Sequence, residues 1–214
     1  MSNYPLQVSQ LACIRGDRRL FSDLSFELQA GQLLYLKGRN GSGKTTLQRS
    51  LAGLFHPDAG EIRWHNRPVT SLGESYFKDL LYIGHAPGIK LDLTAVENLR
   101  FQCRLKGLNI AEAQIWDALG KLGLAGFEDL PARVLSAGQK RRITLARLFL
   151  DHSKLWILDE PFTALDVAAV DLLLDLITGH LGLQGMVVLT THQEVMLPQE
   201  RVLEITLGPV SYTH

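Results

Sequence analysis

The sequence lacks several features that would assign it to a whole class of protein. Its 214 residues include only two cysteines, Cys13 and Cys103, which stand far apart and form no metal-ligand spacing. Residues 1–5 show no basic-then-apolar signal, and no uncharged apolar run approaches the roughly 20 residues of a membrane helix. We therefore expect a cytosolic chain with unpaired thiols, in which any membrane span is supplied by another chain.

An excess of charge of one sign is also missing. The 22 basic side chains of Lys and Arg balance 22 acidic ones, so the formal net charge is zero. Nothing in this balance indicates nucleic acid as a partner. Hydrophobic residues make up 46% of the chain, which is enough for a sizeable core, and the length suits one large domain or a domain with a subdomain.

A glycine-rich stretch is the first positive signal. Residues 38–45 read GRNGSGKT and fit the phosphate-binding pattern G-x-x-x-x-G-K-[ST] at each fixed position. Glycines let backbone N–H groups converge on one anion, Lys44 adds a charge for the β- and γ-phosphates, and Thr45 offers a hydroxyl to Mg²⁺. The residues expected at the phosphates are Gly38, Arg39, Asn40, Gly41, Ser42, Gly43, Lys44, Thr45 and Thr46.

The sequence around this stretch supports the same interpretation. The apolar run 33–36 predicts a buried strand, and residues 46–52 predict a helix whose positive N-terminal end faces the phosphates. A flexible Gly/Ser turn is the alternative, but it needs neither the Lys-Thr pair nor this setting. The motif predicts binding of a nucleoside triphosphate, and kinases, GTPases, helicases and transport ATPases all stay open.

Strand-like and helix-like patterns alternate along the chain. Strands are expected at 6–11, 24–28, 33–36, 61–64, 80–84, 154–158 and 185–190, with one or two more beyond residue 201. From about Leu93 to Leu150 the strand signals vanish, which predicts a helical subdomain inserted into an α/β core. Ser71 and Glu74 fit a capping box and predict a short helix after Ser71, and residues 167–180 have the spacing of an amphipathic helix.

Polar groups follow two of the predicted core strands. Asp159 and Glu160 come directly after an apolar strand, and His192 follows the next one. Since ligands bind at the carboxyl ends of strands in open α/β sheets, we expect these groups to meet Lys44 at one edge. Asp159 is placed to hold Mg²⁺ through water, Glu160 to polarise an attacking water, and His192 to contact the γ-phosphate. A solvated strand end and a histidine with no ligand are the alternatives.

A second helix start carries similar chemistry. Residues 136–139 read SAGQ, a capping box that precedes a helix expected over 140–150. Ser136 and the first free N–H groups of that helix form a second anion-binding start. Because the first site already holds the phosphates, this start is available to a nucleotide in another subunit. A well-capped helix without a ligand is the alternative.

Five motifs together resemble the ATPase domain of ABC transporters. They are residues 38–45, 135–139, 155–160 and 164–166 and His192, in the family's order and spacing. The resemblance covers essentially the whole chain. It implies a single α/β P-loop domain over 1–214, with a mixed or parallel core sheet and an N-terminal antiparallel β subdomain. Residues 1–87 and 151–214 then form the core and the β subdomain, and about 88–150 form the helical subdomain that carries the signature.

The resemblance also implies a site shared between two subunits. Domains of this family pair head to tail, so each ATP lies between one phosphate loop and the signature of the partner. It implies a homodimer that uses ATP and Mg²⁺, in which Ser136, Gly138 and Gln139 act on the partner's ATP. Asp166 resembles the residue that links the two sites.

Two positions depart from the family pattern. Where an aromatic residue usually stacks on adenine, this chain has Arg15, whose guanidinium can still stack on a flat base. Where a glutamine usually touches Mg²⁺ and the membrane subunit, it has His85, which can still bind water or metal. The implied metal ligands are Thr45, Asp159 and His85, and the implied catalytic residues are Lys44, Glu160 and His192.

The segments around these departures narrow the resemblance. Residues 84–90, 93–99, 135–142 and 155–166 are similar to the haem-exporter ATPases of bacterial cytochrome c maturation. This implies integral membrane subunits of a haem exporter as partners, and a place on the cytoplasmic face of the bacterial inner membrane. Hydrolysis is then coupled to haem export or to release of a haem chaperone. We expect no nucleic acid and no directly bound haem. An ABC ATPase for another solute and a soluble ABC ATPase without a transport role are the alternatives.

Overall fold

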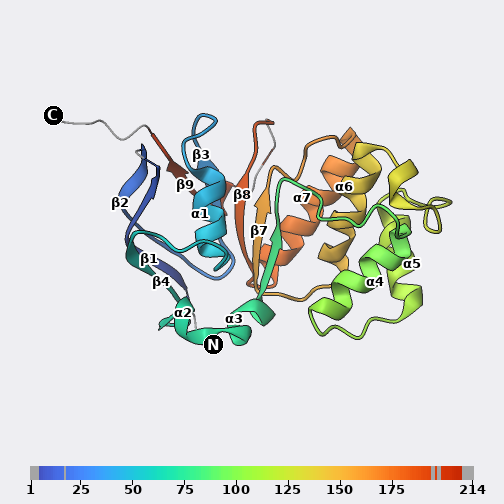
Figure 1. Ribbon diagram of the computed structural model, residues 1–214, viewed down its shortest axis with the longest axis horizontal. Coiled ribbons are helices and arrows are strands. Elements are labelled where there is room, and N and C mark those ends of the chain that lie inside the picture. The colour runs from blue at the N-terminus through green and yellow to red at the C-terminus, as the bar shows by residue number, and fades with distance from the viewer. Residues whose placement is uncertain (1–4, 17, 194–195, 197–198, 209–214) are drawn as a thin grey trace.

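A computed structural model describes residues 5–16, 18–193, 196 and 199–208 of the chain. It contains an antiparallel sheet near the N-terminus, a parallel sheet in the middle and a group of helices on the far side (Figure 1). The predicted fold class is confirmed, because the described chain is α/β with both kinds of sheet. The part of the predicted C-terminal strands that falls on 209–214 lies outside the described residues.

The antiparallel sheet has the strand order β2-β1-β4-β5. Its strands are β1 (Leu6–Arg15), β2 (Arg18–Leu28), β4 (Ala59–Trp64) and β5 (Arg67–Pro68). The first two run well beyond the predicted segments 6–11 and 24–28. Register shifts between Val8 and Ile14 interrupt the pairing of β1 with β2, and such irregularities break the alternation that marks a strand in sequence.

The core sheet has the order β6-β7-β8-β3-β9, and each of its neighbouring pairs is parallel. Its strands are β3 (Leu33–Lys37), β6 (Leu80–Ile83), β7 (Leu155–Asp159), β8 (Met186–Thr190) and β9 (Val202–Thr206). Strands β7 and β8 are buried at every position, as expected for central strands covered on both faces.

The two faces of the core sheet belong to two separate hydrophobic clusters. Leu155 and Ile157 of β7 join a cluster with α1 (Lys44–Leu51) and the antiparallel sheet, whereas Trp156 and Leu158 join a cluster with α7 (Val167–Gly182). Side chains alternate between the faces because successive residues of a strand point in opposite directions. The polar carboxyl ends of the strands are therefore fixed by apolar packing on both sides.

The helices between β6 and β7 form the third part of the structure. They are α4 (Ala95–Leu105), α5 (Glu112–Lys121), η1 (Ala132–Val134), α6 (Ala137–Leu145) and η2 (Ala146–Phe149). No residue of the fully described span 88–150 belongs to a strand of either sheet. The helix expected over 140–150 starts earlier, at Ala137, and its last turn is a 3₁₀ helix. The division of the chain at about 88 and 150 stays a prediction.

One local prediction is only half right. A short helix does follow Ser71, but the predicted capping box is wrong, because Ser71 already lies inside α2 (Val69–Leu72), where its hydroxyl donates to the carbonyl of Pro68 at 2.8 Å. The next helix, α3 (Glu74–Asp79), begins after Gly73, whose φ of 50° separates the two. The short 3₁₀ helix η3 (Gln199–Arg201) precedes β9.

Two expectations about composition can be compared with the structure. Cys13 and Cys103 are both buried and unpaired, which confirms the prediction of free thiols. Among the described residues, no helix is both long enough and apolar enough to cross a bilayer.

Candidate nucleotide-binding site

The glycine-rich loop connects β3 with α1 and needs glycine at particular positions. A Cβ on Gly38, where φ is 142°, would lie 2.5 Å from the carbonyl oxygen of Leu207 and 2.6 Å from the hydroxyl of Ser42. Gly43 precedes α1 with φ of 102°, a conformation that side chains disfavour. The backbone is thereby curled around the Lys44 side chain.

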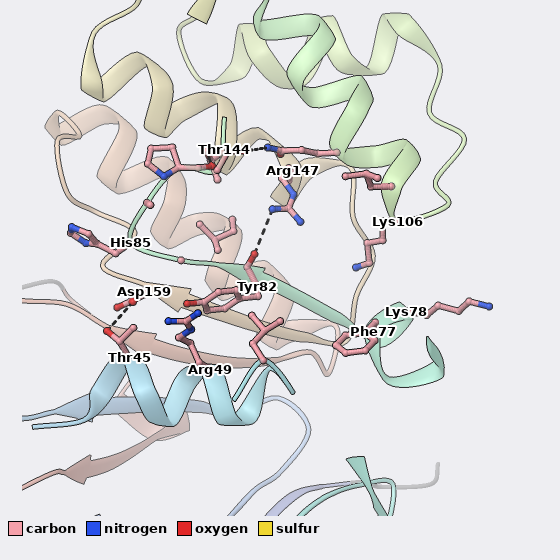
Figure 2. A pocket seen from close by; sticks show the side chains of 18 of the residues that line it. Thr45, Arg49, Phe77, Lys78, Tyr82, His85, Lys106, Thr144, Arg147 and Asp159 are labelled. Carbon is pink, nitrogen blue, oxygen red and sulfur yellow. Dashed lines mark hydrogen bonds between the residues drawn. The ribbon is translucent and has the colours of Figure 1, made fainter. Parts of the chain in front are cut away.

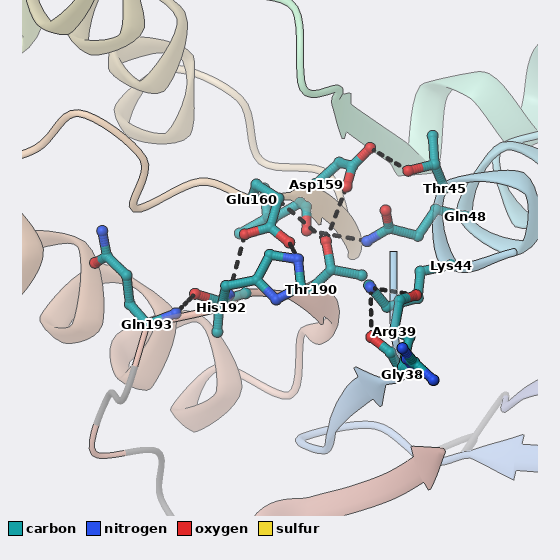
Figure 3. Close-up of polar contacts among 12 residues, drawn as sticks. Gly38, Arg39, Lys44, Thr45, Gln48, Asp159, Glu160, Thr190, His192 and Gln193 are labelled. Carbon is teal, nitrogen blue, oxygen red and sulfur yellow. Dashed lines mark hydrogen bonds and ion pairs between the residues drawn. The ribbon is translucent and has the colours of Figure 1, made fainter. Parts of the chain in front are cut away.

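Lys44 lies at the centre of this curl. Its ammonium donates to the carbonyl oxygens of Gly38 at 2.7 Å and Arg39 at 3.3 Å, and the residue is only 9% exposed (Figure 3). A positive charge held between loop carbonyls at a helix N-terminus suits a polyphosphate, whose oxygens attract the same ammonium and the same N–H groups.

Asp159 ends β7 beside the loop and is fixed by two hydroxyl groups. Thr45 donates to one carboxylate oxygen at 3.0 Å, and Thr190, the last residue of β8, donates to the other at 2.9 Å (Figure 3). Asp159 is 2% exposed. Its charge, after the larger effect of burial, raises the pKa of the nearby Tyr82 phenol. The sequence predicted a role for Asp159 but none for Thr190.

The pair formed by Thr45 and Asp159 fits Mg²⁺. Both supply hard oxygen atoms, and Mg²⁺ in nucleotide sites takes one or two carboxylates together with phosphate oxygens and waters. No group of three or more His, Cys, Asp or Glu side chains with metal-binding geometry occurs within the described ranges. A metal ion at Thr45 and Asp159 would therefore need oxygen ligands from the nucleotide as well.

Glu160 follows Asp159 and has an unusual backbone. Its φ is 50°, in the left-handed region that costs a non-glycine residue about 1–2 kcal/mol. The N–H of Glu160 donates to the carbonyl oxygen of Thr190 at 3.2 Å and to its hydroxyl at 3.1 Å. Such strain persists only where the surroundings enforce it, and it concentrates at functional sites.

His192 holds the carboxylate of Glu160. The backbone N–H of His192 donates to one carboxylate oxygen at 3.1 Å, and the ring Nε2 lies 3.4 Å from the other (Figure 3). The Glu160 side chain is 15% exposed and that of His192 is 56% exposed. The predicted meeting of Lys44, Asp159, Glu160 and His192 at one sheet edge is what the structure shows.

A cleft of about 660 Å³ opens over these groups. It is lined by Arg15, Arg18, Leu20, Asn40, Gly41, Gly43, Lys44, Thr45, Thr46, His85, Asp159, Glu160 and His192. The predicted residues Arg15 and His85 thus lie at the same cleft as the loop. Arg18 and Leu20 were missed, because nothing in the sequence showed that the start of β2 folds over the loop.

A second cleft, of about 980 Å³, meets the first at Thr45, His85 and Asp159. It runs between the core and the helices, and Figure 2 shows His85 near its end beside Thr45 and Asp159. Because it belongs to both clefts, the exposed His85 side chain faces the loop site and the space between the two parts of the chain.

The signature residues lie at the start of α6 and do not line the loop cleft. Ser136 forms the predicted capping box, in which its hydroxyl accepts from the N–H of Gln139 at 3.1 Å and the Gln139 side chain accepts from the N–H of Ser136 at 2.8 Å. A Cβ on Gly138 would lie 2.7 Å from the carbonyl oxygen of Ala164. The preceding Ala137 is exposed, so the departure from glycine there meets no obstacle.

Asp166 caps α7 and contacts the signature helix. One of its carboxylate oxygens accepts from the N–H of Ala169 at 2.9 Å, and the other pairs with the guanidinium of Arg142. The hydrogen bond from the N–H of Ala169 and then the one from Arg142 lower the pKa of Asp166, so the carboxylate is ionised at neutral pH. Asp166 thus ties the segment after β7 to α6 within one chain.

Comparison with known proteins supports a single family. Residues 21–163 match the family model described as ABC transporter. The cytochrome c biogenesis ATP-binding export protein CcmA of Nitrosomonas europaea is 54% identical over 203 residues, which are 95% of each chain. The CcmA protein of Escherichia coli K12 is 50% identical over 202 residues, covering 94% of this chain and 96% of its own.

Solved structures agree at the level of the fold. A putative ABC transporter ATP-binding protein from Pyrococcus furiosus superposes with a TM-score of 0.80 at 22% identity, covering 95% of this chain and 97% of its own. A dimeric ATP-binding cassette, MJ0796, in a post-hydrolysis state bound to ADP and Pi, superposes with a TM-score of 0.76 at 20% identity and covers 88% of each chain.

These matches confirm what the five motifs indicated. The chain is an ATP-binding subunit whose ATP hydrolysis is coupled to transport, and membership of its family implies dimerisation and a membrane partner complex. A soluble ABC ATPase without a transport role is disfavoured by relatives that are named export proteins over nearly their whole length. This chain belongs to the ABC transporter family and, within it, to the CcmA family of cytochrome c biogenesis ATP-binding export proteins.

Proposed function

We propose that this chain is the ATPase subunit of a haem exporter that serves cytochrome c maturation. The observation that carries the proposal is the 54% identity, over 95% of both chains, to a cytochrome c biogenesis export protein. An ABC ATPase for another solute would share the phosphate loop and the carboxylates, but not such a match along the whole chain.

In this proposal the phosphate loop binds ATP. The N–H groups of 38–46 and the Lys44 ammonium neutralise the phosphate oxygens, and Lys44 stabilises the charge that develops in the transition state. To do so, it exchanges the loop carbonyls that it contacts at 2.7 Å and 3.3 Å for phosphate oxygens. Arg15, which lines the same cleft, would stack on the base.

Thr45 and Asp159 would hold Mg²⁺, and His85, which lines the same cleft, would contact it through water. When bound, the ion supplies charge neutralisation on the β- and γ-phosphates. The two protein ligands are already within hydrogen-bonding distance, and Thr190 keeps the other oxygen of Asp159 occupied. Little rearrangement of the chain is therefore needed to form the site.

Glu160 is the proposed general base and His192 its partner. The water attacks the γ-phosphorus in line with the leaving oxygen, and a carboxylate of Glu160 orients it and accepts its proton. His192 contacts the γ-phosphate while its backbone N–H keeps the carboxylate in place, as the 3.1 Å hydrogen bond suggests. The low exposure of Glu160 restricts the bulk water that competes for it.

A second copy of the chain would complete the site. Ser136, Gly138 and Gln139 of one subunit would close over the ATP held by the other, with Asp166 near the contact between the two. Their position at an exposed helix start, outside the cleft of their own chain, supports this arrangement. We further propose that residues 88–150 move as a unit during closure.

The membrane partners are proposed to be the integral subunits of a haem exporter at the cytoplasmic face of the bacterial inner membrane. Haem itself would not contact this chain. The test is complementation of an Escherichia coli strain that lacks its own CcmA protein, which is 50% identical to this chain. We expect this chain, but not its Glu160→Gln variant, to restore covalently attached haem in c-type cytochromes. An ATPase-active chain that restores none, although it is produced and associates with membranes, would show that the transported solute is a different one.

A further inference from the structure

The helix that follows the signature carries a buried arginine to which the mechanism above gives no role. Arg141 lies in the second turn of α6 and is 4% exposed. Its guanidinium donates to the backbone carbonyl oxygens of Gly84, His85, Asp159, Glu160 and Pro161. A buried charge is tolerated only when it is well hydrogen-bonded, so these contacts are the reason that the side chain can lie there.

The contacts of Arg141 divide between two segments of the chain. Nη1 lies 2.8 Å from the carbonyl oxygen of Gly84 and 3.4 Å from that of His85, which follow β6. Nη2 lies 2.8 Å from the carbonyl oxygen of Asp159 and 2.9 Å from that of Glu160, at the end of β7. The planar guanidinium can serve both segments because its donors form a rigid fork, which a lysine lacks.

The contact with Glu160 falls on its strained peptide. Glu160 has φ of 50°, and its N–H is held by Thr190 on one side. On the other side, Arg141 binds the carbonyl oxygens of both Glu160 and Asp159. Since a left-handed non-glycine residue persists only where its neighbours enforce it, Arg141 and Thr190 act as two clamps on one peptide.

We propose that Arg141 is a positioning residue, which sets the Glu160 carboxylate and links it to the His85 segment and to the signature helix. The proposal rests on the role of Glu160 given above. Because α6 begins at the residues expected to meet the second subunit, a shift of α6 on closure moves Arg141 and, with it, the peptide of Glu160. Closure and activation of the base then become one event.

Two neighbours on α6 and η2 supply a comparison. Thr144 donates to the carbonyl oxygen of Pro87 at 2.8 Å, and Arg147 donates to that of Tyr82 at 3.5 Å, so both reach the segment around β6 (Figure 2). Neither has a hydrogen bond to Asp159 or Glu160 among the contacts of the described residues. Arg147 is thus a matched control for loss of a guanidinium from this helical segment.

The test is steady-state ATP hydrolysis by the full chain in complex with its membrane partners, for Arg141→Met, Arg141→Lys and the control Arg147→Met. We expect Arg141→Met to lower kcat by about tenfold to 100-fold, because misplacement by about 1 Å can cost that much. KM for ATP should stay within about threefold, as none of the hydrogen bonds of Arg141 goes to residues 38–45. The kcat of Arg141→Lys should lie between that of Arg141→Met and that of the wild type. A kcat of Arg141→Met close to the wild-type value, or an equal loss in Arg147→Met, overturns the proposal.

The double variant Arg141→Met/Glu160→Gln separates this inference from the proposed function. If Arg141 acts through Glu160, the double variant should be no slower than Glu160→Gln alone in single-turnover hydrolysis. If the Arg141→Met change lowers the single-turnover rate of Glu160→Gln as much as it lowers that of the wild type, Arg141 does not act through Glu160. Normal hydrolysis by Glu160→Gln overturns the base and this inference together, whereas a slow Glu160→Gln with a normal Arg141→Met overturns only the inference. If Arg141→Met does not fold, Arg141→Lys replaces it in the test: a lowered kcat with a nearly unchanged KM supports the proposal, and an unchanged kcat overturns it.

Discussion

The phosphate loop and the signature segment both present a helix N-terminus, yet only the first has charged and titratable side chains of the same chain gathered around it. At the loop, Lys44, Asp159, Glu160 and His192 come from three strand ends and line one cleft. At the signature, the capping box of Ser136 is complete, but Ser136 and Ala137 are exposed and the segment lines no part of that cleft.

The groups around the phosphate loop (the loop half of the site) and the signature segment (the signature half) also differ in what holds them in place. The loop half depends on the core sheet, since both oxygens of Asp159 and the N–H of Glu160 are held by side chains or backbone of neighbouring elements. The signature half depends on local contacts, through the capping box and the approach of Gly138 to Ala164. A helix start held by its own cap, outside the cleft of its own chain, is well suited to a ligand held by another subunit.

Loss of the base should give the largest effect and would act on the loop half alone. We expect Glu160→Gln to lower kcat by about 10²–10⁴-fold, the usual contribution of a general base, because the amide cannot accept the proton. ATP binding should persist, since the loop is unchanged, and an ATP-dependent dimer should accumulate. Hydrolysis rates together with size-exclusion chromatography measure both effects. A variant that hydrolyses ATP at the normal rate would show that another group takes the proton.

A bulky charge at the signature should act on the dimer and leave the loop intact. We expect Ser136→Arg, placed in the Glu160→Gln background, to abolish ATP-driven dimerisation while the monomer still binds ATP. In the otherwise unchanged chain, hydrolysis should fall at least about tenfold, because the second half of the site is no longer positioned.

The control for this change is Ser136→Thr, which keeps a hydroxyl cap on α6. Titration of ATP, followed by light scattering, distinguishes binding from association. Unchanged dimerisation of Ser136→Arg would contradict a site shared between two subunits and would make the chain's own cleft sufficient.

A single methyl group at the signature should give the smallest effect. We expect Gly138→Ala to destabilise the fold by about 1–3 kcal/mol, since its Cβ would lie 2.7 Å from the backbone carbonyl oxygen of Ala164, which can shift only with the main chain. The matched change Ala137→Gly, at an exposed neighbour, should cost no more than about 1 kcal/mol. Urea unfolding of both variants tests the difference. Equal stabilities would show that the contact with Ala164 relaxes freely.

Much of the loop half could be predicted because its signals are local. The spacing of Gly38, Gly43 and Lys44 and the apolar run before Asp159 each specify a strand, a turn or a charge within a few residues. Thr190, Arg18 and Arg141 escaped notice, because each acts on residues far away in sequence. None of the three belongs to a sequence motif. Only the folded arrangement shows that Thr190 binds Asp159, that Arg18 lines the cleft, and that Arg141 binds the backbone of Glu160.

The prediction of a helix cap at Ser71 failed for a related reason, although the short helix expected after it is present. A capping box is a short pattern that competes with neighbouring signals, and here Pro68 and Gly73 set the helix boundaries instead. At Ser136 the same kind of pattern was correct, because no stronger signal lies next to it.

The sequence alone determined the α/β fold, the phosphate loop, the carboxylate pair and the family, since each follows from residue types at fixed short spacings. Only the tertiary structure decided that Thr190 holds Asp159, that His85 joins two clefts, and that Arg18 and Leu20 line the cleft of the loop. It alone placed Arg141 against the peptide of Glu160. These relations depend on packing between segments that are far apart in the chain, and no local pattern encodes them.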